Sequence, residues 1–383
     1  MASFPHQSQD SITAITTRGQ GASLGNRLER LHQTVRHNFN FVDRIAAVLY
    51  DEDTDLLRTF IESSTKASPL SHYEFPLRGS PTLSQIARHR EARVLHDLEQ
   101  AMEDPAHEHT RRIVEAGYKS SFTVPMHHCG NLLGFVFFDS VHRSVFNPLV
   151  QGHLNLYSDM IALMITTELQ TVLTLRSAVR AVGDLAGFRD LETANHQKRM
   201  AHYCRLIALK LIDGYERSDD YIEHLFLFAP LHDIGKMAIP DRVLLKPGPL
   251  TAEEFDLMKT HPEKGLEIAD TLLRDIGLQN CANIDLLRNV IFYHHENWAG
   301  GGYPTGIRGE AIPLEARIIA VADVFDALTS QRPYKKAWTI DKTMLSLDRL
   351  AGTKLDPTCV AALKENLDAA TKVMHQFCEN TIG

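Results

Sequence analysis

The feature that most constrains this chain is a series of histidines and aspartates at the ends and centres of apolar segments in its second half. EHLFLFAPLHDIGK places His232 and Asp233 directly after an apolar run, and LLRNVIFYHHE ends on His294 and His295. Asp323 lies inside the apolar segment RIIAVADVFDAL. Because burying an isolated carboxylate is costly, these positions need a compensating charge or hydrogen bonds, and a metal ion would supply that charge.

Two further segments extend the pattern. In DLETANHQKRMAHYCRLIALKLI, Glu192 and His196 are four residues apart and therefore share one face of the predicted helix. His261 precedes a proline at an expected helix–helix corner. Taken singly, each residue also suits a satisfied core position or a solvated one. Together, five histidines and three acids exceed one mononuclear site and predict a cluster with a bridging carboxylate, for which Asp233 is the best candidate.

The residue types narrow the chemistry. Imidazole and carboxylate ligands without thiolate suit iron or manganese at least as well as zinc. Multinuclear sites of this kind favour phosphoester hydrolysis. The five cysteines are scattered and never in C-x-x-C spacing, which argues against a disulfide framework or zinc ribbon and favours a reducing, cytoplasmic location.

Length and pattern predict two domains in the 383 residues. Residues 1–25 lack periodicity and are expected to form a disordered arm, whereas residues 26–168 read as α+β. There, DRIAAVLYDEDTDLLRTFIES and SSFTVPMHHCGNLLGFVFFDS each predict a β-hairpin, the second turning at Gly130 and Asn131. Residues 149–185 predict one long connecting helix, and residues 186–383 an all-α domain, in which Gly235 is expected to end a helix.

The long helix carries a narrow apolar seam in steps of four and three residues. Six of its seven positions are apolar, namely Ile161, Ile165, Val172, Leu175, Val179 and Val182, and the seventh is Glu168. Such a seam is typical of a coiled-coil pair, so it predicts a homodimer; packing against its own domain remains an equal alternative.

Charge and hydropathy exclude other classes. A net charge of -8 gives no electrostatic footprint for a nucleic-acid polymer. No segment reaches about 18 consecutive apolar residues, and the N-terminus lacks the pattern of a secretory signal, so no membrane association is expected.

Residues 185–360 resemble the HD-GYP subgroup of the HD-domain phosphohydrolases. The resemblance rests on HDIGKMAIPDRVLLKPGPLTAEEFDLMKTHPEKG followed by HHENWAGGGYPTGIRGEAIPLEARIIAVADVFDALTSQRPYK. It implies a helical bundle with two or three divalent metal ions, the third associated with Glu192. It also implies hydrolysis of cyclic di-GMP to pGpG, and onward to GMP. The implied metal ligands are Glu192, His196, His232, Asp233, His261, His294, His295 and Asp323.

The resemblance also implies roles in substrate binding. The phosphate-contacting lysine of the family falls on Lys236, the loop that names it on Gly302, Tyr303 and Pro304, and two nucleotide-contacting positions on Arg332 and Lys335. Our mechanistic hypothesis is in-line attack on phosphorus by a hydroxide that bridges the metals, with Asp233 and Lys236 as catalytic residues. One departure is Ala299, where the family has an acidic residue. Because Ala299 departs from the family pattern, the alternative function is a non-catalytic receptor of cyclic di-GMP or a scaffold that binds a signalling partner.

Residues 26–168 resemble a GAF domain, chiefly through VPMHHCGNLLGFVFFDS and the helix that follows. The family-level expectation is a regulatory sensor of a small molecule, with a ligand-free dimerisation module as the alternative. His127, His128 and Cys129 abut the hairpin turn and are interpreted as polar turn residues rather than a metal or redox site.

Overall fold

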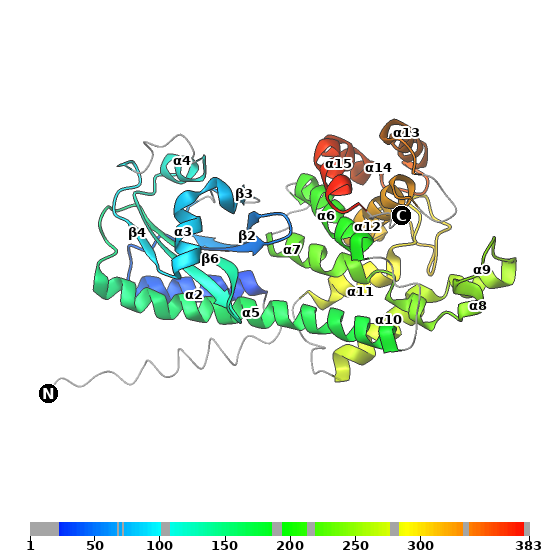
Figure 1. Cartoon of the computed structure of the whole chain (residues 1–383), viewed down its shortest axis with the longest axis horizontal. Helices are drawn as coiled ribbons and strands as arrows, with labels where there is room; N and C mark the ends of the chain where they lie inside the picture. The colour runs from blue at the N-terminus through cyan, green and yellow to red at the C-terminus, as the bar shows by residue number, and fades with distance from the viewer. Residues whose placement is uncertain are drawn as a thin grey trace. The chain divides into compact units, whose positions relative to one another are not determined.

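The computed structural model describes residues 23–66, 69–70, 73–100, 108–185, 194–212, 219–275, 283–331 and 337–378 (Figure 1). The chain forms two compact units, Met1–Gln170 and Thr171–Gly383. Each is described by itself below. None of the helices in the described ranges is both long and apolar enough to cross a membrane.

The first unit is built on one antiparallel sheet with the strand order β3-β2-β1-β6-β5-β4. Consecutive side chains of a strand point to opposite faces of the sheet, and the central strands bury several consecutive residues, so both faces are covered. The strands are β1 (Arg44–Asp51), β2 (Leu56–Ser64), β3 (Glu74–Pro76), β4 (Arg93–Leu95), β5 (Ser120–His128) and β6 (Asn131–Ser140). Both predicted hairpins are present, as the pairs β1–β2 and β5–β6.

The turn of the second hairpin differs from the prediction. Its two linking residues are Cys129 and Gly130, both with positive φ (49° and 89°), whereas Asn131 already pairs with His128 in the ladder. Two successive residues with positive φ match the twist of the strands, and only the second is a glycine. His128 and Cys129 are joined at the turn by a 3.3 Å contact between Nε2 and Sγ.

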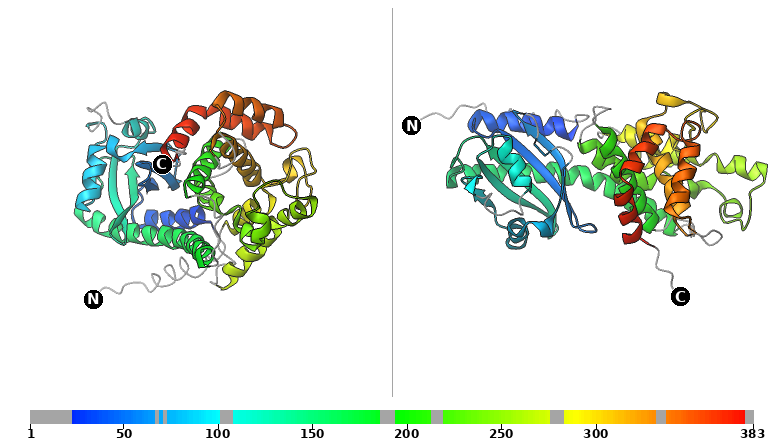
Figure 2. Two further views of the ribbon diagram at one scale, coloured as in Figure 1. Left: turned by 45° about the vertical axis from the view of Figure 1, so that its right-hand side comes forward. Right: turned by 90° about the horizontal axis from the view of Figure 1, so that it is seen from above.

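Helices cover both faces of this sheet. They are α2 (Leu24–Asn38), α3 (Pro81–His89), α4 (Glu108–Glu115) and α5 (Pro148–Leu185), with a 3-10 turn at Leu77–Gly79. α2 and α5 lie along one face (Figures 1 and 2) and bury Leu28 and Ile161 against Phe122 and Phe138. α2 begins two residues before the expected domain start, because Ser23 caps it by accepting a hydrogen bond from a backbone amide.

The predicted seam of α5 faces inward where the structure describes it. Ile161 and Ile165 are buried in the core of the first unit and Val172 in that of the second. Glu168 lies 3.8 Å from Arg27 of α2. The side chains of the last three seam positions, Leu175, Val179 and Val182, lie outside the described residues. For the described positions, packing within the chain is the alternative that holds.

The second unit is helical. Its helices are α6 (Ala194–Leu211), α7 (Asp219–Phe228), α8 (Asp241–Leu244), α9 (Ala252–Met258), α10 (His261–Asp275), α11 (Ile284–Tyr293), α12 (Leu314–Thr329), α13 (Ile340–Leu350), α14 (Pro357–Glu365) and α15 (Leu367–Gln376). Short 3-10 turns lie at Ala229–Leu231, Ile234–Ala238 and Gly309–Ala311.

α6 packs against four other helices of this unit, α7, α12, α14 and α15. Its apolar stripe of Met200, Tyr203, Ile207 and Leu211 is buried in the core. His196 lies at the start of that stripe and is itself buried. The same periodicity that builds the core therefore carries a polar ligand to the edge of it.

Candidate metal centre

His232 and Asp233 lie in an irregular segment between α7 and α8. The prediction that Gly235 ends the helix is wrong, because α7 has already ended at Phe228 and 3-10 turns follow. Gly235 has a different role: a Cβ there would lie 1.8 Å from the carbonyl oxygen of His261. Without a side chain at this position, the segment packs directly on the start of α10 and brings Asp233 next to His261.

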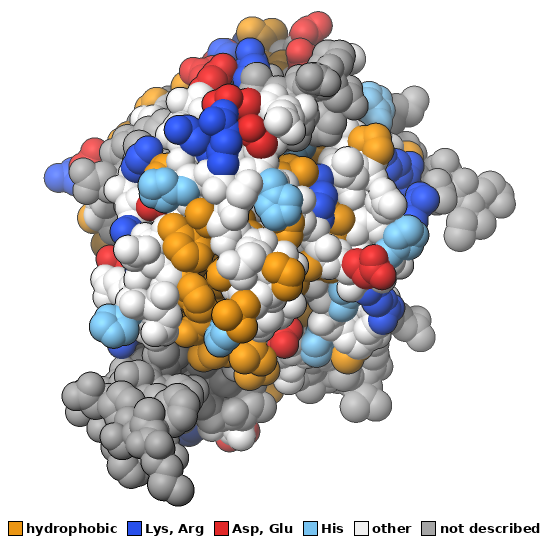
Figure 3. Space-filling model, turned by 90° about the vertical axis from the view of Figure 1, so that its left-hand side faces the viewer, with side chains coloured by type: hydrophobic (Ala, Val, Ile, Leu, Met, Phe, Trp, Pro, Cys, Tyr) orange, Lys and Arg blue, Asp and Glu red, His pale blue; other side chains and the backbone are white. Residues whose placement is uncertain are grey.

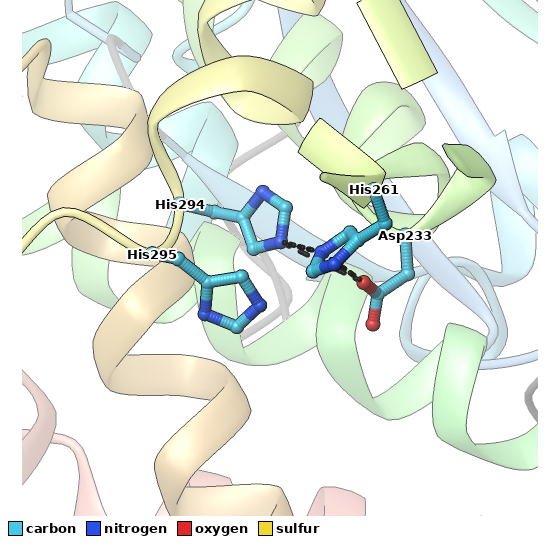
Figure 4. A group of neighbouring side chains, drawn as sticks. All are labelled: Asp233, His261, His294 and His295. Carbon is cyan, nitrogen blue, oxygen red and sulfur yellow. Dashed lines mark hydrogen bonds and ion pairs between the residues drawn. The ribbon is translucent and has the colours of Figure 1, made fainter. Parts of the chain in front are cut away.

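A first group of side chains converges on Asp233 (Figure 4). Ligand atoms of Asp233, His261, His294 and His295 all lie within 4.8 Å of one another. Oδ1 of Asp233 is 3.1 Å from Nε2 of His261 and 3.6 Å from Nε2 of His294. The Nε2 atoms of those two histidines are 3.2 Å apart. The start of α10 and the end of α11 therefore meet at one carboxylate.

The imidazole rings are oriented by their other nitrogens. Nδ1 lies 2.8 Å from a backbone carbonyl oxygen in His232 and in His261, and 2.9 Å from one in His294. A carbonyl oxygen only accepts, so each Nδ1 carries the proton and each Nε2 of the neutral ring presents a lone pair. The Nε2 lone pairs of His261 and His294 face each other at 3.2 Å and repel unless a cation lies between them. Metal-ligating histidines have this orientation, with Nδ1 bonded to a carbonyl oxygen and Nε2 turned to the metal.

A second group consists of His196, His232 and Asp323, whose ligand atoms also lie within 4.8 Å of one another. Oδ2 of Asp233 is 3.2 Å from Nε2 of His232, a member of this second group. Asp233 thus contacts both groups: its Oδ1 faces histidines of the first group and its Oδ2 faces His232 of the second. This is the position that a bridging carboxylate needs.

Asp326 supports the second group, a role that sequence reasoning missed. It is 1% exposed, and its Oδ2 lies 2.7 Å from Nδ1 of His196. Arg199 donates to both oxygens of the same carboxylate, at 2.6 and 3.0 Å. A carboxylate behind a histidine fixes the ring and raises the basicity of its other nitrogen. The sequence signal was an aspartate three residues after Asp323 in the same apolar helix.

Electrostatics favour the charged form of Asp233 and the neutral forms of His294 and His295. Burial alone would raise the pKa of Asp233, but the neighbouring Lys236 ammonium holds that pKa well below its usual range. Burial lowers the pKa of His294, and burial together with the neighbouring His294 lowers the pKa of His295 well below its usual range. An anionic oxygen and neutral ring nitrogens are the donor states that a divalent cation requires.

Lys236 and the glycine-rich loop lie beside the first group. Nζ of Lys236 is 2.6 Å from Oδ2 of Asp233, and its side chain remains 28% exposed. The ring of Tyr303 lies over His295, with 4.7 Å between ring centroids, and Pro304 follows it. A cation and an aromatic ring therefore stand beside the carboxylate and histidines of the first group.

Of the eight predicted ligands, the two groups contain seven. Glu192 and the predicted nucleotide contacts Arg332 and Lys335 lie outside the described residues, so their positions stay predictions. The donor set of five histidines and two aspartates, with lone pairs and charge turned inward, fits divalent cations well.

The comparisons with known proteins agree with this division. Residues 184–359 match the HD domain family and residues 23–165 match the GAF domain family. The chain therefore carries a GAF domain followed by an HD domain. HD-domain phosphohydrolases use divalent metals, which is consistent with the two ligand groups.

Curated relatives carry more specific names. The cyclic di-GMP phosphodiesterase response regulator RpfG of Xanthomonas campestris is 41% identical over 65% of this chain and 60% of its own length. A cyclic di-GMP phosphodiesterase of Thermotoga maritima is 38% identical over 46% of this chain and 45% of its own. The 3'3'-cGAMP-specific phosphodiesterase 2 of Vibrio cholerae is 38% identical over 53% of this chain and 35% of its own length. The chain thus spans less than two thirds of the length of each of these relatives.

Proposed function

We propose that this protein is a metal-dependent phosphodiesterase that opens cyclic di-GMP to pGpG and can go on to cleave pGpG to GMP. The observation that carries the proposal is the position of Asp233, which contacts a histidine of each ligand group through a different oxygen. The names of the relatives and the match to the HD domain family support the reaction class.

Each ligand group would hold one divalent ion, with Asp233 shared between them, and Glu192 is the candidate ligand of a third. Imidazole with carboxylate favours iron or manganese. Ions bound there would lower the pKa of a water molecule and neutralise charge that develops on the phosphate. Iron and manganese are distinguished by metal analysis of protein purified without added metal.

The remaining roles belong to the chain's own side chains. Lys236, fixed against Asp233 but partly exposed, would contact a phosphate oxygen of the substrate. The ring of Tyr303 would offer an apolar surface beside His295 to a guanine base. Arg332 and Lys335 would bind the second phosphate or a guanine edge, which gives an acidic protein a local basic site for a dianionic substrate.

The test is anaerobic and compares the native protein with Asp233→Ala. Each is loaded with iron or manganese, bound metal is quantified, and products of cyclic di-GMP are separated by chromatography. We expect pGpG or GMP from the native protein and neither product from the variant. Turnover of 3'3'-cGAMP instead would change the substrate but keep the reaction class. Full metal occupancy with cyclic di-GMP binding and no product would replace the enzyme by a receptor.

We propose that the GAF domain binds a small molecule and regulates the HD domain through α5, the helix that the two units share. The expected result of ligand binding is a change in turnover, and deletion of residues 1–170 should abolish that response. A reducing compartment, the cytoplasm, is proposed because the four described cysteines, Cys129, Cys204, Cys359 and Cys378, are free thiols.

We also propose a homodimer through α5, by a face other than the predicted seam. Leu149, Leu156 and Leu163 are 73%, 65% and 68% exposed and recur every seven residues. Between Pro148 and Leu163 the helix carries one acidic residue, Asp159, and neither lysine nor arginine, so two copies of this face would meet with little charge repulsion. Hydrophobic side chains also gather near the centre of the face of the first unit that Figure 3 shows.

The sedimentation coefficient tests the dimer. Leu156→Glu should convert the dimer to monomer, whereas Leu345→Glu, at an equally exposed leucine of α13, should not. A monomeric native protein, or a dimer that survives Leu156→Glu combined with Leu163→Glu, would refute this interface.

A further inference from the structure

Glu296, directly after the paired histidines, is a buried carboxylate bonded to a loop rather than to a cation. It is 4% exposed. Its Oε1 accepts hydrogen bonds from the amide of Thr305 (2.7 Å), the hydroxyl of Thr305 (2.7 Å) and the amide of Gly306 (3.0 Å). Oε2 lies 3.1 Å from the same Gly306 amide. Within the described ranges no lysine or arginine forms an ion pair with Glu296.

The residues between Glu296 and Thr305 fold back onto the histidine pair. A Cβ on Gly302 would lie 2.3 Å from the amide nitrogen of Asn297, so only glycine allows this approach. The amide of Tyr303 donates to the carbonyl oxygen of His295 at 3.3 Å. Two contacts therefore set the position of Tyr303: its own backbone bond to His295 and the closure of the loop by the Glu296 carboxylate.

The other end of the loop is held by backbone hydrogen bonds and by Arg317, whose guanidinium lies 5.6 Å from the centre of the Trp298 ring. The amide of Trp298 donates to the carbonyl oxygen of Lys354, and the amide of Ala299 to that of Thr353. These bonds need no side chain at position 299, so the loop keeps its place without the acidic residue expected there. At the Tyr303 end, the side chain that accepts hydrogen bonds from the loop backbone is that of Glu296.

We propose that Glu296 is a positioning residue whose carboxylate gathers Thr305 and Gly306, and that it thereby holds the ring of Tyr303 over His295. This inference rests on the proposed function of the centre, because Tyr303 is expected to contact the substrate there. Hydrogen bonds to a charged group are stronger than those between neutral groups, and three donors share this carboxylate. Without it the loop would stay attached at Trp298 but the Tyr303 side would move away from the histidines.

Hydrogen exchange of the metal-loaded full chain tests the loop without any turnover. Glu296→Ala should accelerate exchange in peptides that cover residues 297–306, by about tenfold or more for the loss of bonds to a carboxylate. The matched control is Glu315→Gln, which changes another buried glutamate (5% exposed) that accepts from Asn289 at 2.6 Å. That control should leave exchange in the loop unchanged. Unchanged exchange in Glu296→Ala would overturn the proposal.

A double-mutant cycle tests whether Glu296 acts through Tyr303. Glu296→Ala and Tyr303→Ala should each lower kcat/KM for cyclic di-GMP about tenfold or more, chiefly through KM, with bound metal unchanged. In the Tyr303→Ala background, removing Glu296 should cost less than about threefold, because the ring that it positions is gone. Independent, multiplicative losses would refute the mechanism.

A failure of the proposed function leaves a different signature. If the native protein turns over no cyclic di-GMP, the same cycle is run on the dissociation constant of cyclic di-GMP, measured by calorimetry on metal-loaded protein. Absence of binding as well would reject the proposed substrate, while the exchange experiment would still decide whether Glu296 holds the loop.

Discussion

The two units bury charge in opposite ways. In the first unit, Arg44 of β1 is 1% exposed and lies 2.6 Å from Asp139 and 2.9 Å from Glu62, so both carboxylates are paired with a cation of the protein itself. In the second unit, Asp233 is surrounded by histidines whose protons are turned away towards backbone carbonyls. The first arrangement is complete within the protein, whereas the second directs negative charge and lone pairs inward at one point. Only the second has the form of a binding site for cations.

The largest effect should come from breaking the closed cluster. Arg44→Met would leave Asp139, 0% exposed, without its cation, and removing one partner of a buried ion pair typically costs about 3–5 kcal/mol. Hydrogen exchange of β1 and β6 peptides measures the loss of stability. Metal content should not change, because the residue lies in the other unit.

The control for that variant is an exposed pair. Arg78→Met removes a side chain that is 89% exposed and 3.6 Å from Asp55, and such pairs contribute roughly 0–1 kcal/mol. If Arg44→Met cost no more than Arg78→Met, the comparison between a cluster that is paired within the protein and one that is open to a cation would fail.

Metal removal should act on the second unit alone. At a metal concentration of about 100 times Kd, binding stabilises the folded state by about 2.7 kcal/mol, and a chelator removes that contribution. Both tryptophans, Trp298 and Trp338, lie in the second unit, so their fluorescence during urea unfolding reports on it specifically. Exchange in β1 and β6 should stay constant. Equal destabilisation of both units would show that metal acts by another route.

How much of this the sequence predicts depends on the range of the interactions. The hairpins and α5 follow from local periodicity, and the ligands stand out because polar residues interrupt apolar runs. The hydrogen bonds around Asp326 cannot be predicted in this way, because they join Arg199 to an aspartate that lies 127 positions away in the sequence. The function of Gly235 is equally invisible, because it is defined by the backbone of α10 that packs against it. Local pattern therefore identifies ligands, and only tertiary structure identifies what orients them.

The smallest effect, and the finest test of the comparison, concerns that orientation. Asp326→Asn keeps the shape of the side chain but removes the charge that faces His196 and Arg199. Replacing such a partner typically lowers metal affinity about 10- to 100-fold. The loss should fall on the second group, because Asp326 bonds His196 and none of the first four ligands. Competition with a chelator should therefore release one metal equivalent at a low chelator concentration, and the other at the chelator concentration that the native protein requires.

The control is Ser330→Ala, which removes a weaker 3.2 Å bond to the same carboxylate and should release metal almost as the native protein does. Simultaneous release of both equivalents from Asp326→Asn would mean that the two groups act as one site, so that Asp233 couples them more strongly than Asp326 distinguishes them.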